Sequence, residues 1–177
     1  MDYLFLFILT TILIFVIFLG FTFLYGIISG VPWVPSGKES VEKMLDMAQV
    51  KDGDCLLDLG CGDGRVLFAA EKRGAKARGY ELAVLAFLFA LIKKVITKSK
   101  SEVYFKNFFR EDLSEADVVF VYLMPKTLGK LKKKLETELK KGTRVLSNSF
   151  QIPGWKVKDR VARNKQGNSF LYLYVVE

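Results

Sequence analysis

The sequence predicts an α/β fold: a mostly parallel, seven-stranded sheet that ends in an antiparallel hairpin and is preceded by one transmembrane helix. Three observations lead to this prediction. From residue 54 onward, short apolar runs alternate with helical patterns, which is typical of a parallel sheet wound on both faces. The last two strand-like runs follow each other without a helix between them. A long uncharged run occupies the amino-terminal end of the chain.

The amino-terminal run is strongly apolar. From Tyr3 to Gly37 there is no charged residue, and the part up to Ile28 consists mostly of Leu, Ile, Phe and Val. Because about 20 apolar residues in a helix cross a bilayer core, we expect residues 1–30 to form a membrane anchor. The alternatives are a buried core helix and a cleaved signal peptide, which would begin with basic residues.

The distribution of charge predicts the orientation of this anchor. All 27 Lys and Arg follow the apolar run, and the whole chain has a formal charge of +8. Basic residues near a span remain on the cytoplasmic side of a membrane. We therefore expect a single-pass protein of the cell membrane, with its amino terminus outside and the remaining domain in the cytoplasm.

The rest of the chain divides into two parts. Residues 31–53 are predicted to form a connector and a leading helix, with Val41, Met44 and Leu45 at helical spacing and Ser36 as a candidate cap. Residues 54–177 form the main domain. Its predicted strands are 54–59, 76–81, 102–106, 117–123 and 143–149, its predicted helices are 65–73, 83–98 and 126–141, and the segments 155–163 and 169–177 are predicted to pair as a hairpin.

The most informative stretch is "DLGCGDGR", which begins at Asp58 and follows the first predicted strand. Glycines at the end of a strand and the start of a helix allow the backbone to approach a ligand closely. A phosphate-binding GxxxxGK[ST] loop is absent, and Arg65 stands where the dinucleotide fingerprint needs its last glycine. The chain has no His, and Cys55 and Cys61 are too far apart along an extended strand for a disulfide. We therefore interpret both cysteines as reduced thiols and predict no metal site.

The second predicted strand ends in Glu81, about 20 residues beyond the glycines. An acidic side chain at this place can accept both hydroxyl groups of a ribose. A ribose-binding acid and a glycine turn without a pyrophosphate site together indicate a nucleoside that lacks a phosphate chain. S-adenosylmethionine fits that description; the simpler alternative is a tight turn plus a surface glutamate.

These residues resemble those of a known family. "DLGCGDGR" and "GYE" are similar to the glycine motif and the acidic residue of Rossmann-like class I S-adenosylmethionine-dependent methyltransferases. More narrowly, "PWVPSGKESVEKML", "KKLETELKKGTRVLSNSF" and "PGW" resemble the membrane-anchored lysine methyltransferases that modify the ATP synthase c-subunit and the adenine nucleotide translocase, together with their prokaryotic relatives.

The resemblance implies a set of cofactor-binding residues. The methionine part of S-adenosylmethionine is expected at the turn, the ribose at the acid, and a "VPS"-like segment over the cofactor. The set comprises Trp33, Val34, Pro35, Ser36, Asp58, Gly60, Cys61, Gly62, Asp63, Gly64, Glu81, Leu82, Asn107 and Phe108. The family often has Asn-Pro where this chain has Leu82 and Ala83, and it favours Asp where this chain has Asn107.

The acceptor side is predicted from topology. The end of the fourth strand lies beside the ligand cleft in doubly wound folds, so Tyr122, Met124 and Pro125 are candidates to line the acceptor pocket. Methyl transfer from a sulfonium needs an aligned neutral amine and exclusion of water, so no obligatory base is expected. The uncharged stretch 82–92 requires burial on both faces, against the sheet and then against the anchor, the membrane or a second subunit. The simpler alternative is a helix packed deeply within the domain.

These observations predict a membrane-anchored protein-lysine N-methyltransferase that acts on an integral membrane protein near the bilayer surface. A lipid or small-molecule methyltransferase and a non-catalytic nucleoside-binding sensor or scaffold are the alternatives. Membrane lipids are expected partners, nucleic acid is not, and the oligomeric state is left open. The lysines of the predicted helix 126–141 indicate a solvated face, with attraction to anionic head groups as the alternative.

Overall fold

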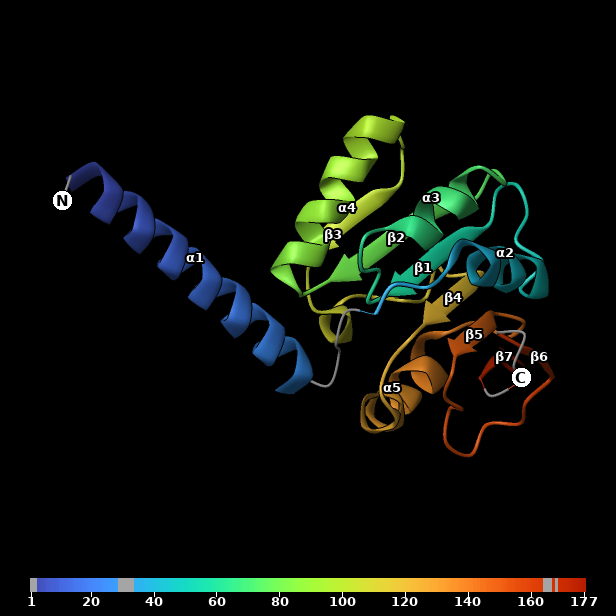
Figure 1. Ribbon diagram of the computed structural model, residues 1–177. Coiled ribbons are helices and arrows are strands. Elements are labelled where there is room, and N and C mark those ends of the chain that lie inside the picture. The colour runs from blue at the N-terminus through green and yellow to red at the C-terminus, as the bar shows by residue number, and fades with distance from the viewer. Residues whose placement is uncertain (1–2, 29–33, 164–166, 168) are drawn as a thin grey trace.

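The computed structural model describes the chain apart from residues 1–2, 29–33, 164–166 and 168. Its centre is a single sheet with the strand order β3-β2-β1-β4-β5-β7-β6 (Figure 1). The strands are β1 (Cys55–Leu59), β2 (Lys76–Glu81), β3 (Glu102–Phe105), β4 (Val118–Val121), β5 (Arg144–Asn148), β6 (Asp159–Ala162) and β7 (Phe170–Val175). The first five strands pair in parallel, and β7 is antiparallel to both β5 and β6. The predicted mixed, Rossmann-like sheet with a terminal hairpin is confirmed.

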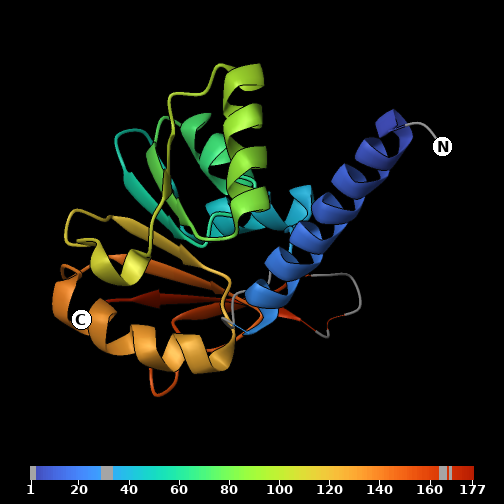
Figure 2. The same ribbon diagram turned by 90° about the vertical axis from the view of Figure 1, so that its left-hand side faces the viewer.

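Helices cover both faces of this sheet (Figure 2). On one face lie α2 (Lys38–Met47), α3 (Arg65–Glu71) and α4 (Val84–Thr97), and on the other lie α5 (Pro125–Glu138) and the short 3₁₀ helix η1 (Phe108–Arg110). Each face has its own apolar core, one around Leu45 and Leu67 and one around Leu128 and Leu131. Because both faces are covered, β1 and β4 are apolar almost throughout, as expected for central parallel strands.

One glycine allows the first helical layer to pack closely on the sheet. A Cβ atom at Gly79 in β2 would lie 2.5 Å from Leu67 Cδ1 and 2.7 Å from Cys61 Sγ. The missing side chain therefore makes room for α3 and for the turn after β1. This contact sets the turn firmly against β2.

The strand order reverses between β1 and β4. Leu59 at the end of β1 pairs in register with Tyr80 of β2 and with Val121 of β4. The segments that follow these three strands consequently meet at one edge of the sheet. In open α/β sheets a crevice forms at this topological switch point.

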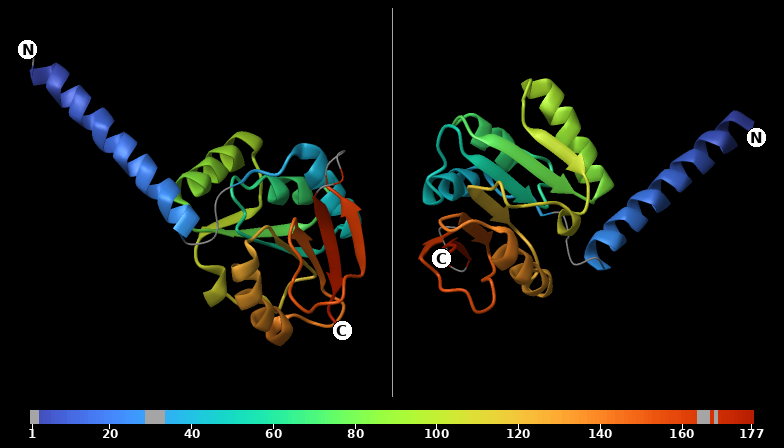
Figure 3. Two further views of the ribbon diagram at one scale, coloured as in Figure 1. Left: turned by 60° about the horizontal axis from the view of Figure 1, so that its bottom comes forward. Right: turned by 180° about the vertical axis from the view of Figure 1, so that it is seen from behind.

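Helix α1 (Tyr3–Ile28) projects away from the domain as a separate rod (Figures 1 and 3). It contains no charged residue, and its described side chains, those of residues 3–18 and 20, are exposed. Within the described part of the chain, no helix is both long and apolar enough to cross a membrane. The membrane-spanning anchor predicted for residues 1–30 is therefore not borne out, although the uncharged helix itself is present.

Several predicted boundaries differ from the structure. Helix α2 begins after Gly37, which makes no side-chain cap, so the prediction that Ser36 caps this helix is wrong. Its hydroxyl instead accepts a hydrogen bond from Asn148 Nδ2 at 3.1 Å. Helix α5 ends at Glu138 because Leu139 is already extended, and β6 is shorter than predicted, with the preceding Trp155 packing edge-on against a tyrosine of β7.

Candidate active site

A cleft lies at the switch point, where the ends of β1, β2 and β4 meet. It encloses about 560 Å³ of empty space, part of which is open to solvent. Its walls come from the segment 34–36, from the turn after β1, and from the last residues of the three strands. Apart from Gly64, the predicted cofactor residues of the turn and of the segment 34–36 are therefore gathered around one cleft.

The turn after β1 has the backbone geometry that requires glycine. Gly60, Gly62 and Gly64 have φ angles of +96°, +56° and +76°, which side chains rarely tolerate. The amide groups of Gly60 and Cys61 donate hydrogen bonds to the carbonyl of Tyr80, at 2.9 and 3.0 Å. The turn is thus fastened to β2 with its backbone facing the cleft.

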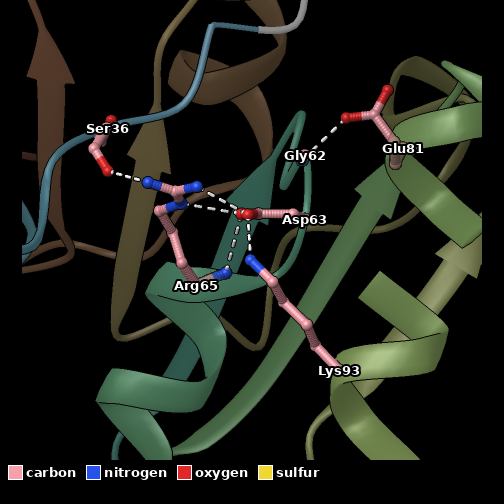
Figure 4. Close-up of polar contacts among 6 residues, drawn as sticks. All are labelled: Ser36, Gly62, Asp63, Arg65, Glu81 and Lys93. Carbon is pink, nitrogen blue, oxygen red and sulfur yellow. Dashed lines mark hydrogen bonds and ion pairs between the residues drawn. The ribbon is translucent and has the colours of Figure 1, made fainter. Parts of the chain in front are cut away.

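Glu81 ends β2 and is almost fully buried, with an exposed fraction of 5%. Its Oε2 accepts a hydrogen bond from the amide of Gly62 at 2.8 Å (Figure 4), and its Oε1 accepts from the amides of Leu82 and Ala83 at 2.7 Å each. Each carboxylate oxygen has two lone pairs, so these bonds fix the side chain without using its whole capacity. One lone pair, on Oε2, remains available to a ligand in the cleft.

Asp58 is a buried carboxyl group on the cleft wall, with an exposed fraction of 6%. No residue in the described part of the chain donates a hydrogen bond to its side chain. Burial raises the pKa of Asp58, and the nearby carboxylates of Glu81 and Asp63 raise it further, to about 8. A buried acid without a donor is costly, so this position favours a ligand that brings a cation or a hydrogen-bond donor.

Asp63 is the centre of a second polar cluster (Figure 4). Its carboxylate accepts two hydrogen bonds from the guanidinium of Arg65, Nε at 2.8 Å and Nη2 at 2.6 Å, and a longer one from the Arg65 amide at 3.4 Å. Lys93 of α4 donates a fourth. Burial alone would raise the pKa of Asp63, but the hydrogen bonds from these two cations outweigh it and lower the pKa to about 2. The cluster joins the turn to α4 and keeps this aspartate ionised.

Arg65 also reaches across the cleft to the segment before α2. Its Nη1 donates to the carbonyl of Ser36 (Figure 4), and Asn148 at the end of β5 holds the hydroxyl of the same serine. Val34 and Pro35 thereby line the cleft. Sequence reasoning identified this segment but treated Arg65 only as a departure from a glycine pattern, and it missed Lys93.

The acceptor side contains one predicted residue, Tyr122, which lines the cleft just after β4. Arg163, from the carboxyl-terminal hairpin, donates to the hydroxyl groups of Tyr122 and Ser149 at 3.1 Å each, and its guanidinium lies 5.1 Å from the centre of the tyrosine ring. Sequence reasoning missed Arg163 because no spacing links it to the fourth strand. Met124 is an exposed helix cap, and Pro125 is the first residue of α5; neither lines the cleft.

Of the remaining predicted residues, those that the structure describes do not line the cleft. Trp33 falls outside the described residues. Leu82 offers its amide to Glu81 while its side chain is exposed. Asn107 accepts a hydrogen bond from the amide of Phe109 and caps η1, and Phe108 is buried in the core on the α5 face.

S-adenosylmethionine fits these features. Asp58 offers an acceptor without a donor to the amino group of the methionine portion, and Glu81 offers the remaining lone pair of Oε2 to a ribose hydroxyl. Gly60 and Gly62 of the turn line the cleft and present backbone there without a side chain. Arg65 forms an ion pair with Asp63. Among the residues described around the cleft, no other cation is available to bind a phosphate chain.

Comparison with known proteins agrees with this assignment. Residues 58–159 match the model of the family described as the ANTKMT methyltransferase domain. The chain is 41% identical over 152 residues to a protein-lysine N-methyltransferase of Saccharolobus islandicus, a match that covers 82% of this chain and 94% of that relative. It is 32% identical over 126 residues to the ATP synthase c-subunit lysine N-methyltransferase of Rattus norvegicus, covering 70% of this chain and 58% of the rat protein.

Among solved structures, the fold is similar to an RNA methyltransferase from Salinibacter ruber in complex with S-adenosyl-L-homocysteine. The TM-score is 0.73 and the identity 33%, over 81% of this chain and 94% of that chain. S-adenosyl-L-homocysteine is the cofactor after loss of its methyl group. The chain belongs to the ANTKMT methyltransferase domain family and is an S-adenosylmethionine-dependent methyltransferase.

Proposed function

We propose that this protein transfers a methyl group from S-adenosylmethionine to the side-chain amine of a lysine in another protein. The observation that carries this proposal is the 41% identity with a protein-lysine N-methyltransferase along nearly the whole of that relative. The match includes the cofactor cleft, so the shared part is the part that performs the chemistry. The rat relative, of which this chain spans little more than half, acts on a lysine of the ATP synthase c-subunit.

The residues of the cleft act by positioning the cofactor and the acceptor amine. The bound cofactor supplies a methyl group that its sulfonium already makes electrophilic. Asp58, Glu81 and the glycine backbone hold the cofactor, and the segment 34–36, tied down by Arg65 and Asn148, limits access of water. The amine must enter in its neutral form and in line with the methyl group. The positive charge of Arg163 disfavours a protonated lysine amine beside Tyr122, so it favours the neutral amine that reacts.

We further propose that the enzyme works at the cytoplasmic face of the cell membrane and modifies an integral membrane protein close to the bilayer surface. In support, residues 3–18 present exposed side chains without a charge, most of them apolar, and every Lys and Arg follows that helix. The relative that acts on the ATP synthase c-subunit has a membrane protein as its substrate. A lysine at the surface of the membrane would meet a cleft whose wall begins a few residues after α1.

The test is an acceptor search with methyl-labelled S-adenosylmethionine. The full chain in detergent is incubated with membranes from a strain that lacks it, and label is measured separately in protein, organic-extractable lipid and RNA. We expect label in a membrane protein band, and label at least about tenfold weaker with the Glu81→Gln variant at a subsaturating cofactor concentration. Label in lipid would mean that the protein is a lipid methyltransferase, and label in RNA would mean that it is a nucleic-acid methyltransferase. Tight cofactor binding without any label would mean that it is a sensor.

A further inference from the structure

The outer face of α4 is apolar and open to solvent. Leu88, Ile92, Val95 and Ile96 have exposed fractions of 47%, 54%, 76% and 74%. They recur at helical spacing, so they form one stripe, which we call the α4 stripe. A surface helix usually places polar residues on this side.

The opposite side of α4 already makes the contacts that the fold needs. Ala86 and Ala90 are fully buried against the sheet, and Phe87 packs on Phe105 of the edge strand β3 with ring centres 5.3 Å apart. Lys93 reaches inward to Asp63. The α4 stripe therefore contributes nothing to the core of the domain, and its apolar character calls for a covering surface.

Basic residues gather at the carboxyl-terminal end of this stripe. Lys98 and Lys100 are exposed there, and Lys94 is partly exposed one turn earlier. Within the described part of the chain, the ion pairs of this region engage Lys93 and Lys106 but none of these three lysines. An apolar stripe edged by unneutralised lysines matches an anionic lipid surface, in which head groups lie beside hydrocarbon.

A second exposed apolar element, α1, lies on the same side of the domain. Helix α1 leaves the domain on the side where α4 begins, with a gap between the two helices (Figure 1). Figure 3 shows the same arrangement from two other directions. The described side chains of α1 are uncharged, mostly apolar and exposed around the whole helix. A lipid surface covers both elements at once, whereas a partner protein on the α4 stripe would leave α1 uncovered, and a second copy would bring two chains of charge +8 together.

We propose that the α4 stripe rests on an anionic membrane surface and is a second membrane contact besides α1. This inference deepens the proposed membrane location and rests on it. Helix α4 begins at Val84, three residues after Glu81 at the cleft wall. A membrane under α4 therefore holds the cleft at a fixed, short distance from the head groups and orients it toward acceptors at that level.

The test places an environment-sensitive fluorophore on the α4 stripe. The full chain carrying Ile96→Cys is labelled and reconstituted into vesicles with and without anionic lipid, some of which contain nitroxide-bearing lipid. The matched control carries Thr137→Cys on the exposed side of α5, and the unsubstituted chain measures labelling of Cys55 and Cys61. We expect a blue shift and lipid quenching at position 96, stronger with anionic lipid, and neither at position 137.

Charge variants test the lysines. Lys94→Gln, Lys98→Gln and Lys100→Gln together should lower quenching at position 96, since each lysine near an anionic surface contributes a factor of about five in binding. The control removes three charges from α5 and the residues after it, with Lys130→Gln, Lys133→Gln and Lys141→Gln, and should leave the quenching unchanged.

Three outcomes overturn the proposal. The first is an unshifted fluorophore at position 96, and the second is a shifted one that lipid nitroxide does not quench, which means that protein covers the stripe. The third is loss of quenching with the control charge variants alone. Methyl transfer is measured in detergent on the same variants, so a failed search for the acceptor and a failed membrane contact give different results.

Discussion

Replacing Asp58 by asparagine should change how the stability of the cofactor-free protein depends on pH. Burial, followed by the charges of Glu81 and Asp63, raises the pKa of this carboxyl group to about 8. In the unfolded chain an aspartate titrates near pH 3.9. Between these values the folded state binds a proton that the unfolded state has released. The free energy of unfolding therefore falls as pH rises from about 4 to 8, and this loss is complete above the folded pKa.

The magnitude follows from the size of the shift. Each unit of pKa corresponds to about 1.4 kcal/mol, so the wild-type protein should lose up to about 3 kcal/mol between pH 5 and pH 7 relative to Asp58→Asn. For a chain of this length that equals roughly 5–10 °C in the melting temperature. The buried side-chain amide of the variant also has no hydrogen-bond partner, but the free-energy cost of burying it does not vary with pH.

The assay is a series of thermal and urea unfolding curves from pH 5 to pH 8, without cofactor and in one detergent. Asp159→Asn on the exposed strand β6 serves as the control and should run parallel to the wild type. The stability of the wild type relative to Asp58→Asn should increase steadily as pH falls. A difference between the two proteins that stays constant over this range would refute the raised pKa and, with it, the unpartnered state of Asp58.

The other predictions concern the cofactor, the packing of the turn and the acceptor side. Calorimetry should show that the protein binds S-adenosylmethionine but not NAD, and that Glu81→Gln weakens binding about 10- to 100-fold; equal affinity in the variant would remove this residue from the site. Gly79→Ala should destabilise the protein by about 1–3 kcal/mol in urea unfolding. The control Gly129→Ala, where the added methyl group meets open space in α5, should stabilise the protein by up to about 1 kcal/mol. Equal effects of the two substitutions would argue against the close packing at β2. Arg163→Gln should lower kcat roughly tenfold by freeing Tyr122, with cofactor affinity unchanged; a loss of affinity instead would place Arg163 on the cofactor.

The sheet could be predicted well from the sequence because its signals are local. The predicted strands are short runs separated by helical patterns, and this alternation leaves few topologies for a parallel sheet. The three glycines of the turn likewise indicate positive φ angles by residue type alone. The position of Glu81 beside that turn follows from the spacing between two adjacent parallel strands.

The contacts that complete the site depend on tertiary structure and left no pattern in the sequence. Lys93 lies in an apolar helix and reaches Asp63 only because α4 packs beside the turn. Arg163 meets Tyr122 only because β7 pairs with β5 and brings the hairpin back to the cleft. Ser36 was expected to cap a helix, but tertiary partners on two other elements engage both of its oxygens.

The central claim is that the cleft directs a methyl group to a lysine side chain, and the most direct measurement is the chemical identity of the product. The full chain is incubated with S-adenosylmethionine carrying a deuterated methyl group and with membranes that lack the enzyme. Proteins that gain the heavy methyl group are then fragmented in a mass spectrometer. The account predicts heavy methyl on the Nζ atom of a lysine in an integral membrane protein, and at least about tenfold less of it with Glu81→Gln at a subsaturating cofactor concentration. Heavy methyl on any other side chain, on lipid or on RNA, would contradict it.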